Sequence, residues 1–499
     1  MVAHTLTDIL DQGAPNYPAI VVPDGPVLNY ARLRQLVTEA ADRLAELGVI
    51  SGDRVAMALP NGPEAIVFFL AAAAGSTACP LNTSYTADEF RFYLEDTSAQ
   101  ILLVPRSEGQ AARTALPKGA VVIEVEIDSR SQLHLESAQP RTPDRIASSS
   151  QPDDVALVLH TSGTTSRPKR VPLRHRQLTA SVSHIIEHYQ LSEGDVSLCV
   201  MPLFHVHGLV ASALAALAAG GSVVAPRKFA PLGFWALARE YHPTWFSASP
   251  TPHRLILMRT SQDRPPGTER LRFVRSCSSA LSPGLMAEME ARYGVPVLEA
   301  YGMTEASHQV ASNPLPLRRR QPGSVGLGTG VEIATMADDG QLLRSGTAGE
   351  VVIKGANVID GYEANPEADA ASFTDGWFRT GDLGLLDRDG YLTISGRLKE
   401  MINRGGEKIS PLEVDAVLES HPAVAEAVCF GQPHSTWGEE VAAAVVLSSS
   451  VDQKALLAYC REHLAEFKVP GHLYFVETIP QTATGKVQRR VVADAFEPK

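Results

Sequence analysis

Cysteine is scarce in this 499-residue chain, and none of it is arranged in pairs. The sequence has no C-x-x-C pair and no spacing typical of metal ligands among its five cysteines, which are Cys79, Cys199, Cys277, Cys429 and Cys460. An odd number of widely separated cysteines indicates reduced, buried thiols. The sequence therefore excludes a disulfide-stapled secreted domain and a cysteine-based zinc site.

Positive charge is also in short supply. The chain has 44 lysines and arginines against 56 aspartates and glutamates, a formal net charge of −12. Binding to nucleic acid or to an anionic membrane requires a basic surface. We expect neither of these as a partner.

Targeting segments and long apolar runs are missing as well. The chain does not open with a basic stretch and an apolar run, and its final FEPK is not a peroxisomal address. One apolar run, 208–225, is dominated by alanine and interrupted by Gly220-Gly221. It predicts a short buried helix, a turn and a strand, with no membrane span. We expect a cytoplasmic protein, either a monomer or a homodimer.

What the chain does contain is a repeated alternation of short β-branched runs with alanine- and leucine-rich helical stretches. This alternation predicts an α/β fold with largely parallel sheets. Residues 325–395 carry more glycines and alternating strands, which predicts a small antiparallel element. After 398 the pattern becomes helix, two strands, helix. We therefore predict an N-terminal domain at 1–397 and a small α+β C-terminal domain at 398–499.

The segment 160–170, HTSGTTSRPKR, has the composition of a phosphate-binding loop. We place a strand before it (154–160) and a helix after it (176–189), so that hydroxyls, backbone N–H groups and Lys169 would cradle an anion. The Walker pattern does not fit, because Lys169 follows a proline and Gly163 is the only glycine. Five serines and threonines argue against a plain surface turn.

Three further segments carry polar chemistry. EAYGMTEASH (299–308) follows an apolar run and offers an aromatic face, a hydroxyl and a carboxylate; a core tyrosine beside a helix cap is the alternative. Asp382, between glycines and placed before a strand, suits two ribose hydroxyls or is a simple turn residue. PQTATGKVQRR (480–490) places Lys486 after two threonines and a glycine, and it could equally be a basic solvated tail.

Together, in this order and spacing, the segments resemble the adenylate-forming superfamily of acyl-CoA synthetases, peptide-synthetase adenylation domains and luciferases. The resemblance spans essentially the whole chain and implies ATP, Mg²⁺, coenzyme A and a small carboxylic acid as ligands. It places ATP or AMP on Thr161, Ser162, Gly163, Thr164, Thr165, Lys169, Ser279, Ala280, Glu299, Ala300, Tyr301, Gly302, Thr304, Asp382, Arg397 and Lys486.

The same resemblance assigns the remaining roles. Catalysis would rest on Lys486, Thr304, Glu305 and His205, with the metal ion at Glu305 and Thr304. Lys399 matches the hinge about which the small domain rotates between two half-reactions. Coenzyme A would contact Gly405, Gly406, Glu407 and Lys408.

Two residues depart from the common family loop. Ser166 stands where glycine is usual, as in the oxalate–CoA ligase branch. Arg170 is unusual even there; it could contact phosphate or face solvent, and we favour solvent because exposed arginines are the rule.

The residues that the resemblance places in the acid pocket are unusually polar. They are His205, His207, Arg275, Ser278, Ser279 and His308. A second, buried carboxylate on the substrate would need such partners, and these segments resemble oxalate–CoA ligases. His207 could equally be a satisfied core histidine. Two other readings stay open: a ligase for a fatty or aryl acid, and a stand-alone adenylation module that loads a separate carrier protein.

Overall fold

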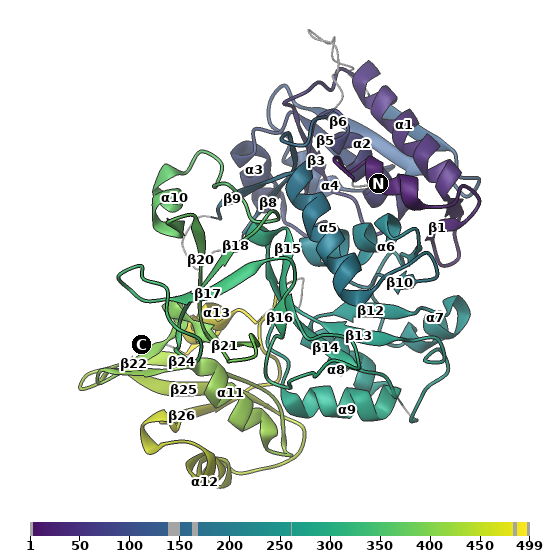
Figure 1. The fold of residues 1–499 in the computed structure, drawn as a ribbon. Coiled ribbons are helices and arrows are strands. Elements are labelled where there is room, and N and C mark those ends of the chain that lie inside the picture. The colour runs from purple at the N-terminus through teal and green to yellow at the C-terminus, as the bar shows by residue number, and fades with distance from the viewer. Residues whose placement is uncertain (1–2, 138–149, 162–167, 261, 483–486, 497–499) are drawn as a thin grey trace.

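A computed structural model describes residues 3–137, 150–161, 168–260, 262–482 and 487–496 of the chain. Figure 1 shows the N-terminal elements in purple and teal at the upper right and the C-terminal elements in yellow-green at the lower left. The predicted α/β fold is confirmed, including the small antiparallel sheet and the small C-terminal α+β unit.

The largest sheet has nine strands in the order β16-β15-β14-β13-β12-β10-β11-β1-β2. The six strands β14, β13, β12, β10, β11 and β1 are parallel to their neighbours in this series. The carboxyl ends of β12, β13 and β14 therefore meet at one edge of the sheet. The strands are β1 (Pro18–Val21), β2 (Val27–Asn29), β10 (Val196–Leu198), β11 (Ser222–Val224), β12 (Trp245–Ala248), β13 (Phe273–Ser276), β14 (Val297–Met303), β15 (His308–Ser312) and β16 (Leu327–Gly328).

A second sheet of seven strands runs in the order β7-β6-β5-β3-β4-β8-β9. Its inner pairs are parallel, and the two edge pairs, β6–β7 and β8–β9, are antiparallel. The strands are β3 (Arg54–Met57), β4 (Thr77–Pro80), β5 (Ile101–Pro105), β6 (Val121–Ile127), β7 (Leu133–Ser137), β8 (Val155–His160) and β9 (Arg170–Arg174).

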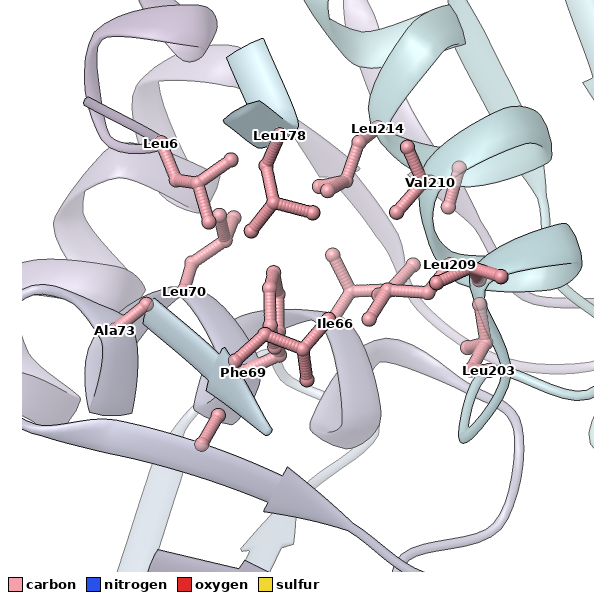
Figure 2. Packing of buried hydrophobic residues seen from close by; sticks show 14 of the residues in the cluster. Leu6, Ile66, Phe69, Leu70, Ala73, Leu178, Leu203, Leu209, Val210 and Leu214 are labelled. Atoms are coloured by element: carbon pink, nitrogen blue, oxygen red, sulfur yellow. The ribbon is translucent and has the colours of Figure 1, made fainter. Parts of the chain in front are cut away.

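Helices join these two sheets into one core. Helix α2 (Pro63–Ala73) is buried along its whole length, because its sequence is apolar on every side. Figure 2 shows its Ile66, Phe69 and Leu70 facing Leu178 of α5 (His175–Tyr189) and residues of the π-helix η2 (His207–Leu214). The run 208–225 forms η2, α6 (Ala215–Ala218) and β11, as predicted, and no helix in the described residues is long and apolar enough to cross a membrane.

The remaining helices of the N-terminal part cover the sheets. They are η1 (Asp8–Gln12), α1 (Tyr30–Glu46), α3 (Ala87–Asp96), α4 (Gln110–Thr114), α7 (Phe234–Tyr241), α8 (Pro250–Met258), α9 (Pro283–Tyr293), η3 (Thr304–Ala306) and α10 (Pro366–Ser372).

The third sheet is antiparallel and holds β17 (Glu332–Met336), β18 (Gly349–Lys354), β19 (Phe373–Thr374), β20 (Trp377–Leu386) and β21 (Leu392–Arg397). A short helix, η4 (Leu398–Glu400), leads from β21 into the C-terminal part. The fourth sheet there contains β22 (Ile402–Arg404), β23 (Glu407–Ile409), β24 (Val424–His434), β25 (Gly438–Leu447) and β26 (His472–Phe475).

This C-terminal sheet has its own buried clusters on its two faces, built with α11 (Pro411–Ser420), α12 (Gln453–His463), η5 (Glu466–Lys468) and α13 (Arg489–Ala495). The helix, strand, strand, helix order predicted after 398 is present. The domain boundary between 397 and 398 remains a prediction.

Candidate active site

The predicted phosphate loop lies between two strands and does not lead directly into a helix. Strand β8 ends at His160, and β9 begins at Arg170, its antiparallel partner. The Thr161 N–H donates to the Lys169 carbonyl at 3.0 Å and so closes the base of the loop. The predicted strand–loop–helix was wrong because a second strand precedes the helix. Residues 170–174 pair with β8 before α5 begins, and Val171 and Leu173 of this strand are buried in the core.

Arg170 is half-buried and paired with Asp96, so the preference for solvent was wrong. Its side chain is 20% exposed, and its Nη1 donates to the Asp96 carbonyl at 2.8 Å. The same nitrogen lies 3.1 Å from the Asp96 carboxylate, which also binds His160 Nε2 at 3.0 Å. A buried carboxylate attracts a cation because it needs a partner. Asp96 therefore ties together the two residues that flank the loop.

A tyrosine links the end of the loop to the predicted metal residue. The Tyr362 O–H donates to the Glu305 carboxylate at 2.9 Å, and the Lys169 ammonium lies 4.3 Å from the centre of the Tyr362 ring. Burial raises the pKa of Glu305, while its bond with Tyr362 opposes that rise. Burial also lowers the pKa of Lys169. Glu305 and Lys169 thus both contact Tyr362.

The residues that fit a magnesium ion are few. No group of three or more histidine, cysteine, aspartate or glutamate side chains in the described residues could hold a metal. Mg²⁺ is usually held by one or two protein ligands together with substrate phosphates. The buried Glu305 carboxylate and the hydroxyl of Thr304, at the start of η3, match that donor set.

The predicted ribose residue, Asp382, lies within β20 and not before it. Asp382 is the register partner of Arg397 in the neighbouring strand β21, and Arg397 Nε is 3.0 Å from the Asp382 carboxylate. The Tyr301 O–H donates to the other carboxylate oxygen. Burial and the neighbouring Asp382 charge raise the pKa of Tyr301 well above its ordinary value. The structure therefore brings together three residues predicted from separate motifs.

The motif 299–303 lies in the second half of β14, and not after the strand. Ala300 is buried there. The Glu299 side chain is buried, and one of its oxygens accepts the Leu281 N–H at 2.9 Å. A Cβ on Gly302 would lie 1.8 Å from the His308 carbonyl, so the close approach of β15 requires glycine. Ser279 and Ala280 follow β13 and are more exposed than its core residues.

At the centre of the predicted acid pocket, Arg275 is fully buried on β13. Its Nε donates to the Tyr189 hydroxyl at 2.9 Å, and its Nη1 donates to Ser247 Oγ at 2.9 Å and meets His207 Nε2 at 3.3 Å. Its Nη2 lies 2.8 Å from His308 Nε2 and 2.9 Å from Gln309 Oε1. The five N–H groups of an arginine are thereby all used.

His207 and His308 face each other beside this arginine. Their rings are stacked, with centroids 5.2 Å apart. Burial, together with the Arg275 charge, holds the pKa of both imidazoles well below the usual range. Both rings are therefore neutral near pH 7. His207 is a satisfied core histidine, and it also contacts a residue of the predicted pocket, Ser278.

The backbone at this pocket is strained. Ser278 (φ 76°), Ser307 (φ 51°) and His308 (φ 113°) all have positive φ angles, which non-glycine residues rarely adopt. Such conformations gather at functional sites. His205, at the start of the approach to η2, is half-buried, and its Nδ1 accepts the His207 N–H at 3.3 Å.

The predicted hinge and coenzyme A residues are on the surface. Lys399 is exposed in η4. Gly405 and Gly406 form the turn between β22 and β23, both with positive φ, and Glu407 and Lys408 follow in β23. Figure 1 shows β22 at the outer edge of the C-terminal part.

Several predicted residues fall outside the described part of the chain. They are Ser162, Gly163, Thr164 and Thr165 of the phosphate loop, with Ser166, and the predicted catalytic Lys486.

Sequence reasoning missed five residues that complete the site: Asp96, Tyr189, Ser247, Gln309 and Tyr362. One signal was available, because Ser247 and Gln309 are polar residues in strands that are buried along their whole length. Polar side chains in such strands need partners.

The chain matches the models of a known enzyme family. The family model of the AMP-binding enzymes matches residues 10–363, and that of their C-terminal domain matches 413–486. The chain belongs to the AMP-binding enzyme family. Among the relatives of this AMP-binding enzyme, a probable CoA ligase, CCL9, of Humulus lupulus is 46% identical over 99% of this chain and 96% of its own.

Two further relatives are informative. The oxalate–CoA ligase of Arabidopsis thaliana is 44% identical over the whole of both chains. The o-succinylbenzoate CoA synthetase (MenE) of Bacillus subtilis, in complex with ATP and magnesium ion, has a TM-score of 0.84 at 30% identity and covers 97% of this chain and 98% of its own. This AMP-binding enzyme is an AMP-forming acid–CoA ligase, and its substrates are ATP, coenzyme A and a carboxylic acid.

Proposed function

We propose that the acid substrate is oxalate or another small dicarboxylate. The observation that carries this proposal is the fully buried, charged Arg275, which forms no ion pair with an aspartate or glutamate anywhere in the described chain. A buried charge is stable when it is paired. A second carboxylate on the substrate, bound in the pocket beside this arginine, would supply the missing negative charge.

The 44% identical oxalate–CoA ligase of Arabidopsis supports this choice. An apolar acid would leave the charge uncompensated and would bring hydrocarbon against the imidazole of His308 and the hydroxyl of Ser278. Burying polar groups without partners costs free energy. The pocket chemistry therefore disfavours a fatty or aryl acid.

In the first half-reaction, a carboxylate oxygen of the acid attacks the α-phosphorus of ATP, and pyrophosphate leaves. Glu305 and Thr304 would hold Mg²⁺, which neutralises phosphate charge. Lys169, held over Tyr362, and the loop residues Thr161, Ser162, Gly163, Thr164 and Thr165 would bind the leaving phosphates. Lys486 would offset the charge that develops at the α-phosphate.

The nucleoside would lie against β14. Tyr301 would face the adenine, beside Ser279, Ala280, Glu299, Ala300 and Gly302, while Asp382, oriented by Arg397, would accept the ribose hydroxyls. His205 would lie at the entry for the reacting carboxylate.

In the second half-reaction, the sulfur of coenzyme A attacks the acyl carbon, and AMP leaves. The small domain would turn about Lys399 and bring Gly405, Gly406, Glu407 and Lys408 to the pantetheine. The exposed position of that hairpin leaves it available to a ligand.

The substrate is tested by a panel of oxalate, malonate, octanoate and a cinnamate, each with ATP, Mg²⁺ and coenzyme A. We expect the highest kcat/KM with oxalate. A higher value with octanoate would overturn the dicarboxylate proposal, and adenylate formation without thioester formation would favour a carrier-loading module.

The catalytic assignment is tested separately with Lys486→Ala. Loss of adenylate formation with little change in ATP binding is expected, because the lysine acts on charge that develops in the transition state. Pyrophosphate release at the wild-type rate would contradict it.

A further inference from the structure

We propose that Arg275 acts as a positioning residue, which fixes the hydrogen-bond direction of the acid pocket so that Ser278 and His308 present donors to the substrate's second carboxylate. This inference rests on the proposed function. It goes further because Arg275 has no N–H left for a ligand, so its influence must pass through its neighbours.

One arm of this arrangement runs through His207. Arg275 Nη1 donates to Ser247 Oγ at 2.9 Å, and Ser247 Oγ lies 2.6 Å from His207 Nε2. The Ser247 oxygen accepts from the arginine, and its own proton is free to donate to His207 if Nε2 carries none. Arg275 Nη1 also faces the same imidazole nitrogen at 3.3 Å, which excludes a proton there.

The consequence reaches Ser278. A neutral imidazole that accepts at Nε2 carries its proton on Nδ1. His207 Nδ1 lies 2.9 Å from Ser278 Oγ, so the imidazole donates to the serine. The Ser278 hydroxyl has then accepted one bond, and its own proton is left to donate elsewhere.

The second arm is shorter. Arg275 Nη2 lies 2.8 Å from His308 Nε2, and an arginine can only donate. His308, neutral because its pKa is held far below the usual range, must carry its proton on Nδ1. Its contacts with other described residues leave that N–H unbonded.

Both chains of hydrogen bonds therefore begin at the positive charge of Arg275. One ends in the Ser278 hydroxyl and the other in the His308 Nδ1–H, and both of these groups are donors. Chains of hydrogen bonds that point the same way strengthen each other, most of all in a buried site. Such a pocket favours an acceptor with full negative charge. The second carboxylate of a dicarboxylate has this chemistry, whereas a methyl or phenyl group does not.

Gln309 offers a nearly isosteric way to test the charge. Its Oε1 accepts from Arg275 Nη2 at 2.9 Å and from the Tyr189 hydroxyl at 3.1 Å, while its Nε2 is buried without a partner in the described residues. Gln309→Glu would keep the acceptor and give Arg275 an internal carboxylate. We expect KM for oxalate to rise on the order of 30-fold or more, with a much smaller change in KM for ATP.

The matched control is Gln432→Glu, an equally conservative change at a buried glutamine in the small domain. It should leave KM for oxalate unchanged. An unaltered KM for oxalate in Gln309→Glu would overturn the inference, as would an equal rise in both variants.

Tautomers supply a readout that does not depend on the substrate. Imidazole ¹⁵N spectra of the whole protein labelled in histidine, assigned with His207→Gln and His308→Gln, should show Nδ1–H for both residues. Arg275→Met should change this pattern. Nε2–H tautomers in the wild type would overturn the inference, whatever acid the panel selects; failure of oxalate in that panel with Nδ1–H tautomers would overturn the proposed function alone.

Discussion

Two buried arginines of this ligase are stabilised in opposite ways. Arg489, at the start of α13 in the small domain, lies 2.7 Å from the Asp415 carboxylate and 3.3 Å from that of Glu400. Arg275, in the predicted acid pocket, is surrounded by hydroxyls, imidazoles and an amide. One site balances its charge within the protein, and the other leaves it unbalanced.

In our proposal, the difference separates the structural charge of Arg489 from the functional charge of Arg275. Neutral acceptors satisfy the N–H groups of Arg275 but not its charge, and an arginine cannot lose its proton in a protein. The predicted acid pocket thus contains a positive charge that no aspartate or glutamate of the described chain balances. Arg489 in the small domain has no unbalanced charge, because Asp415 and Glu400 pair with it. Glu400 belongs to η4, so this ion pair links α13 to the segment that contains the predicted hinge.

The largest effect on stability is expected for Arg489→Met. Removal of the arginine leaves the buried Asp415 carboxylate without a counter-charge, which costs about 3–5 kcal/mol. Chemical denaturation followed by near-UV circular dichroism measures the loss in free energy of unfolding. A loss below that of Arg275→Met would break the comparison between the two sites.

Arg275→Met should destabilise the protein less, by about 1–3 kcal/mol, because it leaves neutral acceptors unpaired and removes an uncompensated charge. Its effect on function is expected to be larger, with a steep rise in KM for oxalate. Steady-state kinetics and denaturation of the same preparation give both values. Comparable kinetic defects in Arg489→Met and Arg275→Met would contradict the functional assignment.

Glu299 shows how a buried acid solves the same problem by taking up a proton. Burial raises its pKa to about 8, against an ordinary 4.5. Between these values the folded state holds a proton that the unfolded state has released, so this contribution to stability falls as pH rises. Below pH 4.5 it is fully present, and above pH 8 it is lost.

Glu299→Gln removes this titration while keeping an acceptor for the Leu281 N–H. Relative to wild type, the variant should gain stability as pH rises from about 4.5 to about 8, by about 1 kcal/mol or more at pH 7.5. Denaturation curves across this pH range measure the difference. A difference that does not depend on pH would show that Glu299 is ionised in the folded protein.

The smallest effect is expected where the two parts of the molecule touch. Arg254 of α8 lies 2.5 Å from the Glu419 carboxylate of α11 and also donates to the Ala425 carbonyl. Arg254→Ala removes this contact from the domain arrangement of this structure, which the proposed rotation about Lys399 would replace. We expect the pyrophosphate-exchange and thioester-forming rates to move in opposite directions, by a few-fold, since partly exposed pairs contribute about 0.2–1 kcal/mol.

Arg461→Ala is the matched control, because Arg461 pairs with Glu466 within the small domain. Equal changes in both half-reactions of Arg254→Ala would indicate a general loss of stability and no effect on domain arrangement.

The sequence was sufficient for the fold class and for part of the candidate site. Alternating runs predicted the parallel sheets, and the motifs that contain Tyr301, Asp382 and Arg397 proved to meet in space. Local pattern could not show that 170–174 is a strand, because its pairing with β8 is decided by the tertiary fold. It also could not place Arg170, whose partner, Asp96, lies 74 residues earlier.

The partners of Arg275 illustrate the same limit. Tyr189, Ser247 and Gln309 come from three separate elements, and nothing in their immediate sequence announces an arginine. Only the tertiary fold brings them to one guanidinium: β12 pairs with β13, β15 pairs antiparallel with β14 on the other side, and Tyr189 ends α5.

The paired ends of the phosphate loop have a consequence for protein engineering. His160 and Arg170 are register partners, and both are fixed to Asp96. Residues 161–169 can therefore be exchanged as one segment, because β8 and β9 hold its two ends in place. Loops from related ligases, with glycine in place of Ser166, could be transplanted into this frame and compared for pyrophosphate release without redesign of the surrounding protein.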